Sequence, residues 1–589
     1  MPSENPAPSA KRHVGDFAPN APLLRLSLFA IIIGGLSTLG AIVLLDLIRL
    51  FTNLFYFGAW SVANRSPADN QLGYWAAAVP VAGGLIVGLM ARFGSEQIRG
   101  HGIPEALEAI LFGKSRMSPK VALLKPLSSG IVIGSGGPFG AEGPIIMTGG
   151  AAASLLAQAL HLTAAERKAL LVAGACAGMT AVFGTPLAAI LLAVELLLFE
   201  LRPRSLLPVA ISCAVAGFLR PLWAGAGPLF PLTTPAPTTI AMLSCCAAGL
   251  ACGLASSLMT VALYRVEDLF SRLPVHWMWW PAIGGVAVGL GGLLQPRALG
   301  VGYDVIGDLL ANHIVVSAAL ALLLVKFTIW VIALGSGTSG GVLAPLLMIG
   351  AGVGLVLSPW LPGGSPQLWA LVCMAAILGG TMRAPLTAVV FAFGLTHDAN
   401  AFLPTILGCA VAYGFTVIVM PRSILTEKIA RRGRHVYREY GVDPLERHFV
   451  EEVMTRSVRS VDADTPVGGV YSSTFGPGQA HRAFPVVRNK RLLGVVDRTL
   501  IEAACARDPL QPVGEIFVDQ PPPPYALAHE SCRVVAERLV TTSQERLPVV
   551  ADADSLRLLG IVSRSDLLKP LRSRYEEEEL RERVFRLGR

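Results

Sequence analysis

Apolar residues dominate the first 420 positions and form two kinds of stretch. Some runs approach the roughly 20 residues that a helix needs to cross the hydrocarbon core of a bilayer. Others are short and interrupted by glycine or proline, and broken helices at membrane depth are tolerated only where they are buried in protein or line a watery cavity. We therefore expect an all-α polytopic membrane domain. The long runs are 24–48, 74–92, 240–264, 281–294, 315–334 and 401–420, and the broken runs are 121–133, 144–160, 168–182, 187–200, 343–357, 367–380 and 384–396.

The apolar region repeats itself. A lysine stands nine positions before a Gly-Ser-Gly triplet, and a proline stands eight positions after the triplet; the two copies are offset by 201 positions, and a later Pro-Leu pair by 199. Two related halves, about 22–220 and 240–435, are predicted, with a transport site at their interface. The repeat leaves open whether the halves are inverted. The paired residues are Lys125 and Lys326, Gly134 and Gly335, Pro144 and Pro345, and Pro186 and Pro385.

After Pro421 the chain becomes more polar and is typical of a soluble α/β protein. Two strand-like pairs recur, 483–487 with 492–496 and 546–550 with 558–562, which predicts a second, smaller repeat. We place its copies at 445–510 and 511–572. Residues 1–21 are predicted to be a disordered tail, and 573–589 a charged tail.

Composition agrees with a membrane protein, because 53% of the residues are hydrophobic, only 15% are charged and the mean hydropathy is +0.57. The net charge of +8 is explained by short cytoplasmic connections rich in Lys and Arg, so nucleic acid is not expected as a partner. We expect an inner or plasma membrane location with both termini cytoplasmic. The nine cysteines show no metal-ligand spacing and are expected to be buried hydrophobes. The basic clusters are Lys11 and Arg12; Lys114, Arg116 and Lys120; Arg202 and Arg204; and Arg431, Arg432 and Arg434.

Three glycine-rich strings indicate an anion site. An anion that crosses a bilayer must exchange its water for other donors, and backbone N–H groups at helix N-termini supply them. Glycine lets the backbone approach a ligand closely, and proline suits the first turn of a helix. The strings are Gly100-His-Gly-Ile-Pro-Glu105, Gly140-Ala-Glu-Gly-Pro144 and Gly340-Gly-Val-Leu-Ala-Pro345. Lys125 and Lys326 either raise the local positive potential or form structural ion pairs.

With these strings and the Pro186 and Pro385 segments, residues 22–435 resemble the chloride channel (CLC) family of anion channels and anion/proton antiporters. The resemblance implies two inverted halves, a homodimer with a pore in each subunit, chloride as the permeating ion and no required cofactor. It also implies that Glu142 is the gate, whose carboxylate occupies the outer anion site when ionised. The anion-binding positions it implies are His101, Gly102, Ile103, Ala141, Glu142, Gly143, Val342, Leu343, Ala344 and Leu425.

The anion pocket departs from the family's pattern at three positions. His101 stands where the family usually has serine, Leu343 where it has phenylalanine, and Leu425 where it has tyrosine. Two hydroxyl donors are thus replaced. We hypothesise that a ring N–H of His101 donates to the anion and makes its affinity pH-dependent. The alternative is a His101 that bonds to backbone and turns away from the pore.

A fourth departure concerns protons. The family's antiporters usually carry an inner glutamate, which aligns here with Leu196. Leucine cannot carry a proton, so passive conduction is favoured over coupled exchange. Glu195 is one residue away and remains a candidate for an inner proton path, so a chloride/proton antiporter stays open as the alternative.

The C-terminal repeat resembles a tandem CBS module, a regulatory domain that often binds adenine nucleotides. In its second copy the resemblance assigns Ser563 and Arg564 to the phosphate side and Asp566 to the ribose. The first copy has Leu500 in place of that aspartate. One nucleotide site is therefore expected, with a purely structural dimerising module as the alternative.

Other classes of function fit the sequence less well. A fluoride-selective relative remains open because the pocket is altered. A CBS-containing divalent-cation transporter would need acidic residues within the apolar segments, which are few. No nucleophile–base set or metal spacing indicates an enzyme. The expected partners are the lipid bilayer, small anions and a second copy of the chain.

Overall fold

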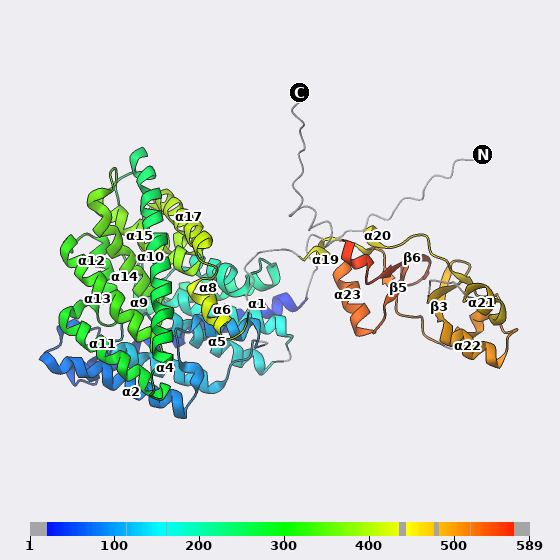
Figure 1. Ribbon diagram of the computed structural model, residues 1–589, viewed down its shortest axis with the longest axis horizontal. Coiled ribbons are helices and arrows are strands. Elements are labelled where there is room, and N and C mark those ends of the chain that lie inside the picture. The colour runs from blue at the N-terminus through cyan, green and yellow to red at the C-terminus, as the bar shows by residue number, and fades with distance from the viewer. Residues whose placement is uncertain are drawn as a thin grey trace, which may run out of the picture. The chain divides into compact units, whose positions relative to one another are not determined.

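Figure 1 shows the protein as a computed structural model, which describes residues 21–113, 115–160, 162–434, 443–475, 482–518 and 520–569. The chain divides into two compact units, Met1–Tyr440 and Gly441–Arg589. The predicted N-terminal tail, apart from residue 21, and the predicted tail 573–589 lie outside the described residues. So do Lys11, Arg12 and Lys114 of the basic clusters.

The first unit is built from helices, as its apolar pattern predicts. Eight helical segments of its described residues are long and apolar enough to cross a membrane. The helices are α1 (Ala21–Phe57), α2 (Ala78–Phe93), α3 (Ile103–Leu111), α4 (Pro119–Gly134), α5 (Glu142–Gln158), α6 (Ala164–Phe183), α7 (Pro186–Leu192), α8 (Pro203–Leu219), α9 (Pro221–Ala224), α10 (Thr239–Ser271), α11 (Trp280–Leu294), α12 (Tyr303–Leu310), α13 (Val316–Gly335), α14 (Leu343–Leu357), α15 (Pro366–Met382), α16 (Pro385–Thr396), α17 (Phe402–Val419) and α18 (Ile424–Arg431).

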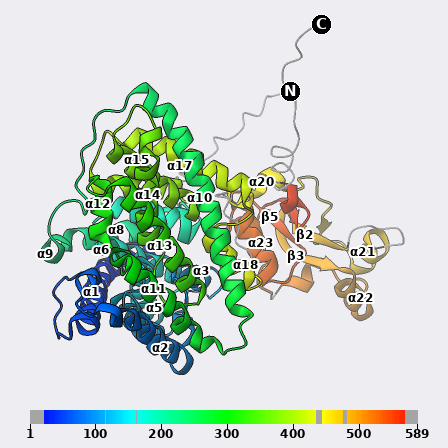
Figure 2. The same cartoon turned by 60° about the vertical axis from the view of Figure 1, so that its left-hand side comes forward.

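The helices differ from the predicted runs most clearly between residues 187 and 219. The run 187–200 begins as α7 but continues as a π-helical turn over Ala193–Leu198. The helix α8 was not predicted, because arginines precede it and Pro208 interrupts its apolar residues. Beyond this region, α10, α15 and α17 pack side by side, and α14 packs on α15 (Figures 1 and 2).

Two cavities lie at opposite ends of α4, and they show in which direction the helices of each half run. Val121, near the start of α4, lines the α18 cavity, which also includes Glu105 and Arg432. Ile133, about 18 Å further along the helix, lines the α12 cavity, which also includes Tyr303. The counterpart of α4 in the second half, α13, ends in Gly335 at the α18 cavity, where α4 begins. The two halves are therefore inverted, which the sequence repeat left open.

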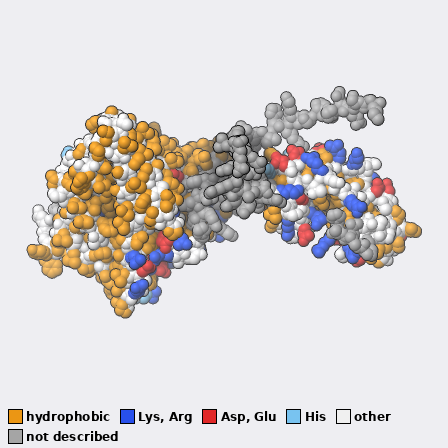
Figure 3. Space-filling view, turned by 45° about the horizontal axis from the view of Figure 1, so that its top comes forward, with side chains coloured by type: hydrophobic (Ala, Val, Ile, Leu, Met, Phe, Trp, Pro, Cys, Tyr) orange, Lys and Arg blue, Asp and Glu red, His pale blue; other side chains and the backbone are white. Residues whose placement is uncertain are grey.

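The surface of the first unit suits a lipid environment. Hydrophobic side chains cover most of the face seen in Figure 3, and charged side chains gather at one edge of it. On α10, Leu254, Leu258 and Val261 are each at least half exposed. A band of exposed aliphatic side chains on a 33-residue helix is stable where lipid, rather than water, surrounds it.

The second unit contains two similar three-stranded sheets, which explains the smaller sequence repeat. In each sheet the first strand pairs parallel to the second, and the second pairs antiparallel to the third. The N–H of Leu492 donates to the carbonyl of Leu556 at 2.9 Å and joins the two copies. The elements are α19 (Pro444–Arg447), α20 (Val450–Val453), β1 (Val461–Asp462), α21 (Val467–Thr474), β2 (Ala483–Arg488), β3 (Arg491–Asp497), α22 (Arg498–Arg507), β4 (Ala526–Leu527), α23 (Cys532–Thr541), β5 (Arg546–Val550) and β6 (Leu558–Ser563).

Candidate functional site

The starts of α5 and α14 meet at a two-residue bridge between the halves. The N–H of Gly140 donates to the carbonyl of Gly341 at 3.1 Å, and the N–H of Gly341 donates to the carbonyl of Gly140 at 2.9 Å. Two of the glycine-rich strings, more than 190 residues apart in the chain, therefore lie against each other with their helices starting at the same point. Ala141, Val342 and Ala344 are fully buried there.

The third string joins them through direct backbone contact. A Cβ placed on Gly143 would lie 1.9 Å from the carbonyl oxygen of His101, and one on Gly102 would lie 2.6 Å from the carbonyl oxygen of Gly143. Gly102 also has a φ of +90°, which favours glycine. Any side chain at these two positions would push the start of α3 away from the start of α5. The three strings thus form one site.

Glu142 is the first residue of α5 and is completely buried at this junction. Its Oε1 accepts the hydroxyl of Tyr303 at 3.3 Å. The backbone amides of Glu142 itself and of Ala344 also interact with the carboxylate, whereas its Oε2 has no hydrogen-bond partner among the described residues. A carboxyl group therefore lies at the positive ends of α5 and α14. Sequence reasoning missed Tyr303, because it follows a turn outside the three strings.

His101 is buried, and neither ring nitrogen has a hydrogen-bond partner in the described part of the chain. A backbone-bonded imidazole, the alternative considered from the sequence, is therefore not what the structure contains. Buried polar groups normally have a partner, and an orphaned one often marks the position of a ligand, ion or water. Contact between His101 and an anion stays a prediction.

The amide of Gly102 has a partner within the chain, and contact between Gly102 and an anion stays a prediction. The amide donates to Oε2 of Glu105 at 2.9 Å, which makes Glu105 a cap for the start of α3. The other carboxylate oxygen of Glu105 lies 3.6 Å from Nζ of Lys428 and 3.2 Å from a guanidinium nitrogen of Arg432. Ile103 is buried at the next position.

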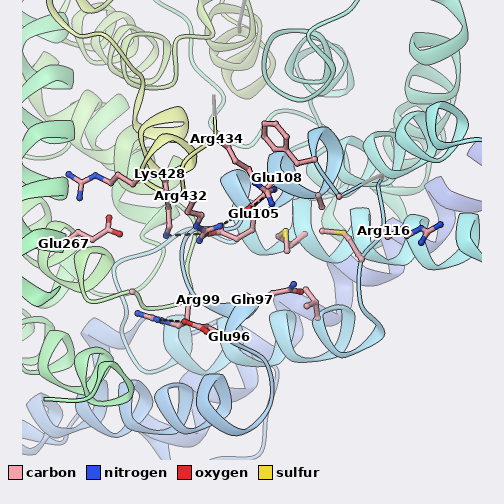
Figure 4. A pocket seen from close by; sticks show the side chains of 18 of the residues that line it. Glu96, Gln97, Arg99, Glu105, Glu108, Arg116, Glu267, Lys428, Arg432 and Arg434 are labelled. Carbon is pink, nitrogen blue, oxygen red and sulfur yellow. Dashed lines mark hydrogen bonds and ion pairs between the residues drawn. The ribbon is translucent and has the colours of Figure 1, made fainter. Parts of the chain in front are cut away.

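The α18 cavity, with a volume of about 780 Å³, opens beside Glu105 (Figure 4). Arg432 bonds both Glu105 and Glu108, and Arg434 lies 3.0 Å from Glu108. A cleft lined by an excess of one charge raises the local concentration of ions of the opposite sign. Its basic residues are Arg99, Arg116, Lys428, Arg431, Arg432 and Arg434, and its acidic residues are Glu96, Glu105, Glu108 and Glu267.

The α12 cavity, with a volume of about 530 Å³, opens beside Tyr303, at the opposite end of α4 from the α18 cavity. Tyr303 lines this cavity and also bonds Glu142, so the carboxylate lies one side chain away from it. Four arginines and one aspartate line the cavity. They are Arg49, Arg65, Arg220, Arg297 and Asp304.

The two repeated lysines hold loops, and neither forms an ion pair with a residue in the part of the chain that the structure describes. Nζ of Lys125 donates to the carbonyls of Ile98 at 2.8 Å and Gly100 at 2.9 Å. Nζ of Lys326 donates to those of Ala298 and Gly300, both at 2.9 Å. The repeat therefore extends upstream: the loop before α12 is the counterpart of the loop before α3.

Two further predicted positions are apolar and buried. Leu343 lines a small apolar pocket together with Leu196 and Thr387. Leu425 lies in the first turn of α18, where the hydroxyl of Tyr264 donates to the carbonyl of Ile424 at 2.5 Å. Both leucines are at most 1% exposed. Their contact with an anion stays a prediction.

Glu195, the candidate for an inner proton path, lies in the π-helical turn after α7 and caps the start of α16. Its carboxylate accepts the N–H of Leu386 at 3.2 Å, the N–H of Thr387 at 2.7 Å and the hydroxyl of Thr387 at 2.6 Å. These contacts give the side chain a structural role, and its role in proton movement stays a prediction.

In the second unit, the residues assigned to a nucleotide already have partners within the chain, and Ser563 and Asp566 bond to each other. Oδ2 of Asp566 accepts the N–H of Ser563 at 2.9 Å and its hydroxyl at 2.7 Å, while Oδ1 lies 2.7 Å from Nζ of Lys569. Burial raises the pKa of the Asp566 carboxyl, but the hydrogen bonds from Lys569 and Ser563 outweigh it, and the pKa lies below the ordinary value of 3.8. Arg564 donates to the carbonyl of Gln544 at 3.3 Å. Nucleotide binding by these residues stays a prediction.

Comparison with known proteins identifies the family. Residues 83–417 match the family described as voltage gated chloride channel, and residues 450–504 and 513–573 match the CBS domain. A ClcB-like chloride channel protein of Ralstonia nicotianae is 29% identical over 374 residues, which are 61% of this chain and 87% of its own length. A voltage-gated ClC-type chloride channel, ClcB, of Citrobacter koseri is 30% identical over 367 residues, which are 60% of this chain and 85% of its own.

Known structures share the fold. That of a slow cyanobacterial Cl⁻/H⁺ antiporter covers 71% of this chain and 99% of its own, with a TM-score of 0.61 and 21% identity. That of a eukaryotic CLC transporter covers 92% of this chain and 98% of its own, with a TM-score of 0.56 and 20% identity. With its inverted halves, converging helix starts and C-terminal CBS pair, the chain belongs to the voltage gated chloride channel (CLC) family of membrane transport proteins.

Proposed function

We propose that this protein conducts chloride passively across a bilayer and that Glu142 is its gate. The observation that carries this proposal is the buried Glu142 carboxylate at the starts of α5 and α14, one side chain away from the α12 cavity. A carboxylate and a chloride ion compete for the same kind of site, because both are stabilised by the backbone donors and dipoles of helix N-termini. The path is closed while the carboxylate remains there and open when it leaves.

The proposed path follows a chain of contacts. From the α12 cavity it passes Tyr303 and Glu142, then the contact of Gly143 with His101, and reaches the α18 cavity beside Glu105. Both ends are lined by more basic than acidic side chains, which favours anions over cations. His101 supplies a ring N–H to the anion at the middle of this path, in place of a hydroxyl.

Passive conduction is proposed because the inner part of a proton path is apolar. Leu196 and Leu343 line the same small pocket, and neither side chain can carry a proton. Glu195 is engaged by three donors at the start of α16. Moving a proton through this carboxylate would break the cap that it provides.

A chloride/proton antiporter is the second candidate, and one contact favours it. Thr387 bonds Glu195 and also lines the apolar pocket with Leu343, so Glu195 is one side chain away from a pocket that reaches the start of α14. Water entering this pocket would link it to Glu142. Fluoride is a further candidate substrate, since the hydroxyl donors of the family's pocket are replaced.

We also propose the sidedness and assembly. Arg116, Arg431, Arg432 and Arg434 line the α18 cavity, which supports a cytoplasmic location for that cavity and for the termini. The protein is proposed to act as a homodimer with one path in each subunit. The CBS module is proposed to regulate conduction, with an adenine nucleotide as its candidate ligand.

Flux measurements in liposomes test these proposals. Purified protein should dissipate a chloride gradient without moving protons uphill, and Glu142→Gln should conduct faster, because its neutral side chain competes less with chloride for the helix starts. Uphill proton movement in the wild type, lost in Glu142→Gln, would establish the antiporter instead. Fluoride and magnesium fluxes measured in parallel would identify the other substrate classes.

A further inference from the structure

The loop before α12 repeats the loop before α3 but lacks the capping contact that Glu105 makes there. In the first half, Glu105 accepts the N–H of Gly102 and so occupies the start of α3. The lysine contacts pair Gly100 with Gly300, which places Gly302 opposite Gly102 and Val305 opposite Glu105. An alkyl side chain accepts no hydrogen bond. The start of α12 has Asp304 in its first turn, but no side chain caps its N-cap residue Gly302, in contrast to the start of α3.

A second observation points to a ligand at the same place. Arg220 is only 5% exposed, lines the α12 cavity, and has a buried Nε with no hydrogen-bond partner among the described residues. Its guanidinium packs over Gly184, where an added Cβ would lie 3.0 Å from it, and it donates weakly to the carbonyls of Gly225 and Gly227 at 3.2 and 3.3 Å. No carboxylate pairs with this buried cation in the described part of the chain, and an unpaired buried charge is costly.

The other arginines of the cavity differ from Arg220. Arg49 lies 3.2 Å from Asp46, and Arg297 is paired with Asp308. Arg65 is exposed and stacks on Phe57. These charges raise the electrostatic potential of the cavity. The guanidinium groups of Arg49, Arg65 and Arg297, however, are already engaged by their own partners. Arg220 is thus the arginine left to bind a ligand.

We propose that the α12 cavity contains a separate anion-binding site, formed by Arg220 and the uncapped start of α12, which takes up chloride before it reaches Glu142. A volume of about 530 Å³ has room for on the order of ten waters at about 30 Å³ each, so the ion is bound there with part of its hydration shell. Tyr303 lies in the same cavity and donates to Glu142. The remaining water is lost at the next step, when the anion replaces the carboxylate.

The inference rests on the proposed chloride function. It is tested by equilibrium binding, so that a missing Arg220 site can be told apart from a missing transport activity. Chloride is titrated calorimetrically into the detergent-solubilised full chain for the wild type, Arg220→Gln and Arg49→Gln. Arg220→Gln should weaken one class of chloride sites by about tenfold, as expected for loss of a hydrogen bond from a charged group. Arg49→Gln, which removes the same charge from the same cavity, should change affinity by less than about twofold.

Equal losses of chloride affinity in the two variants would overturn the proposal, because the effect would then come from the general electrostatic potential of the cavity. No loss in Arg220→Gln would overturn it as well. If Arg220→Gln fails to fold, Arg220→Lys replaces it: the charge is kept but the Nε donor is lost, and the same class of sites should weaken. A chain that binds chloride at the Arg220 site but does not transport it in liposomes would refute the proposed function and leave this inference standing.

Discussion

The carboxylate of Glu195 accepts the backbone N–H of Thr387 at 2.7 Å, so the end of the α7 segment in one half caps α16 in the other. The reverse contact is different. Gly394, which corresponds to Glu195 at the offset of 199, packs against Thr185 at the start of α7, where an added Cβ would lie 2.6 Å from Cγ2 of the threonine. The repeat is thus symmetric in its helices and asymmetric in its polar contacts.

Glu195→Ala should lower the free energy of unfolding by about 1–2 kcal/mol, because the start of α16 loses its cap. The measurement is thermal unfolding of the purified protein in detergent. Glu195→Gln keeps an acceptor oxygen and should lose less. A Glu195→Gln variant with unchanged stability but altered proton flux would contradict the structural role and assign this side chain to a proton path.

Replacing His101 should change anion binding, because its ring nitrogens have no other partner in the described residues. We expect His101→Leu to weaken chloride binding by about two- to tenfold, the loss of one hydrogen bond. His101→Ser restores a hydroxyl and should recover part of the affinity. Chloride titrations and flux between pH 5 and 8 measure both effects. Unchanged selectivity and pH response in His101→Ser would remove the histidine from the anion site.

Lys125→Met and Lys326→Met should each destabilise the membrane unit, because each substitution leaves two buried carbonyls without a donor, at a cost of about 1–3 kcal/mol per group. Thermal unfolding in detergent measures the loss. Lys120→Met is the matched control, since Lys120 is exposed on the same helix as Lys125 and should be neutral. A loss as large in Lys120→Met would show that charge, and not the carbonyl contacts, is responsible.

The second unit should lose stability in acid through Asp566. Its pKa lies below the ordinary value of 3.8 in the folded chain, so the carboxylate stabilises the fold above about pH 4, and this contribution is lost as the pH falls through the folded pKa. Scanning calorimetry of the full chain should show Asp566→Asn melting below the wild type at pH 7, with the difference shrinking as the pH falls through the folded pKa. A difference that is independent of pH would exclude ionisation as its cause.

Nucleotide binding by the second CBS copy should compete with the contacts of Asp566. A ribose hydroxyl that bonds this carboxylate must displace Ser563 or Lys569, which now occupy both oxygens. We therefore expect ATP, ADP or AMP to bind more tightly to Lys569→Ala than to the wild type. Thermal shift titrations measure this, with Lys490→Ala as a control outside the contact. No shift with any of the three nucleotides in either protein would leave the module a structural one.

Much of the architecture could be read along the chain, because hydropathy and the placement of glycine and proline are local properties. They indicated the membrane helices, the two repeats and the three strings around Gly102, Gly143 and Gly341, and close packing of the strings follows from the absence of a Cβ. The helix α8 escaped this reasoning because Arg204 and Pro208 interrupt its apolar residues near its start.

What the tertiary structure alone decided is which side chains occupy the helix ends. Tyr303 reaches Glu142 across 161 positions, Thr387 binds Glu195 across 192, and Arg220 lines a cavity with the start of α12. No local pattern encodes such contacts, because they depend on two inverted halves meeting in space. The sequence by itself determined where helices can begin, and the packing of the halves decided which of those helix starts are capped by the protein's own side chains.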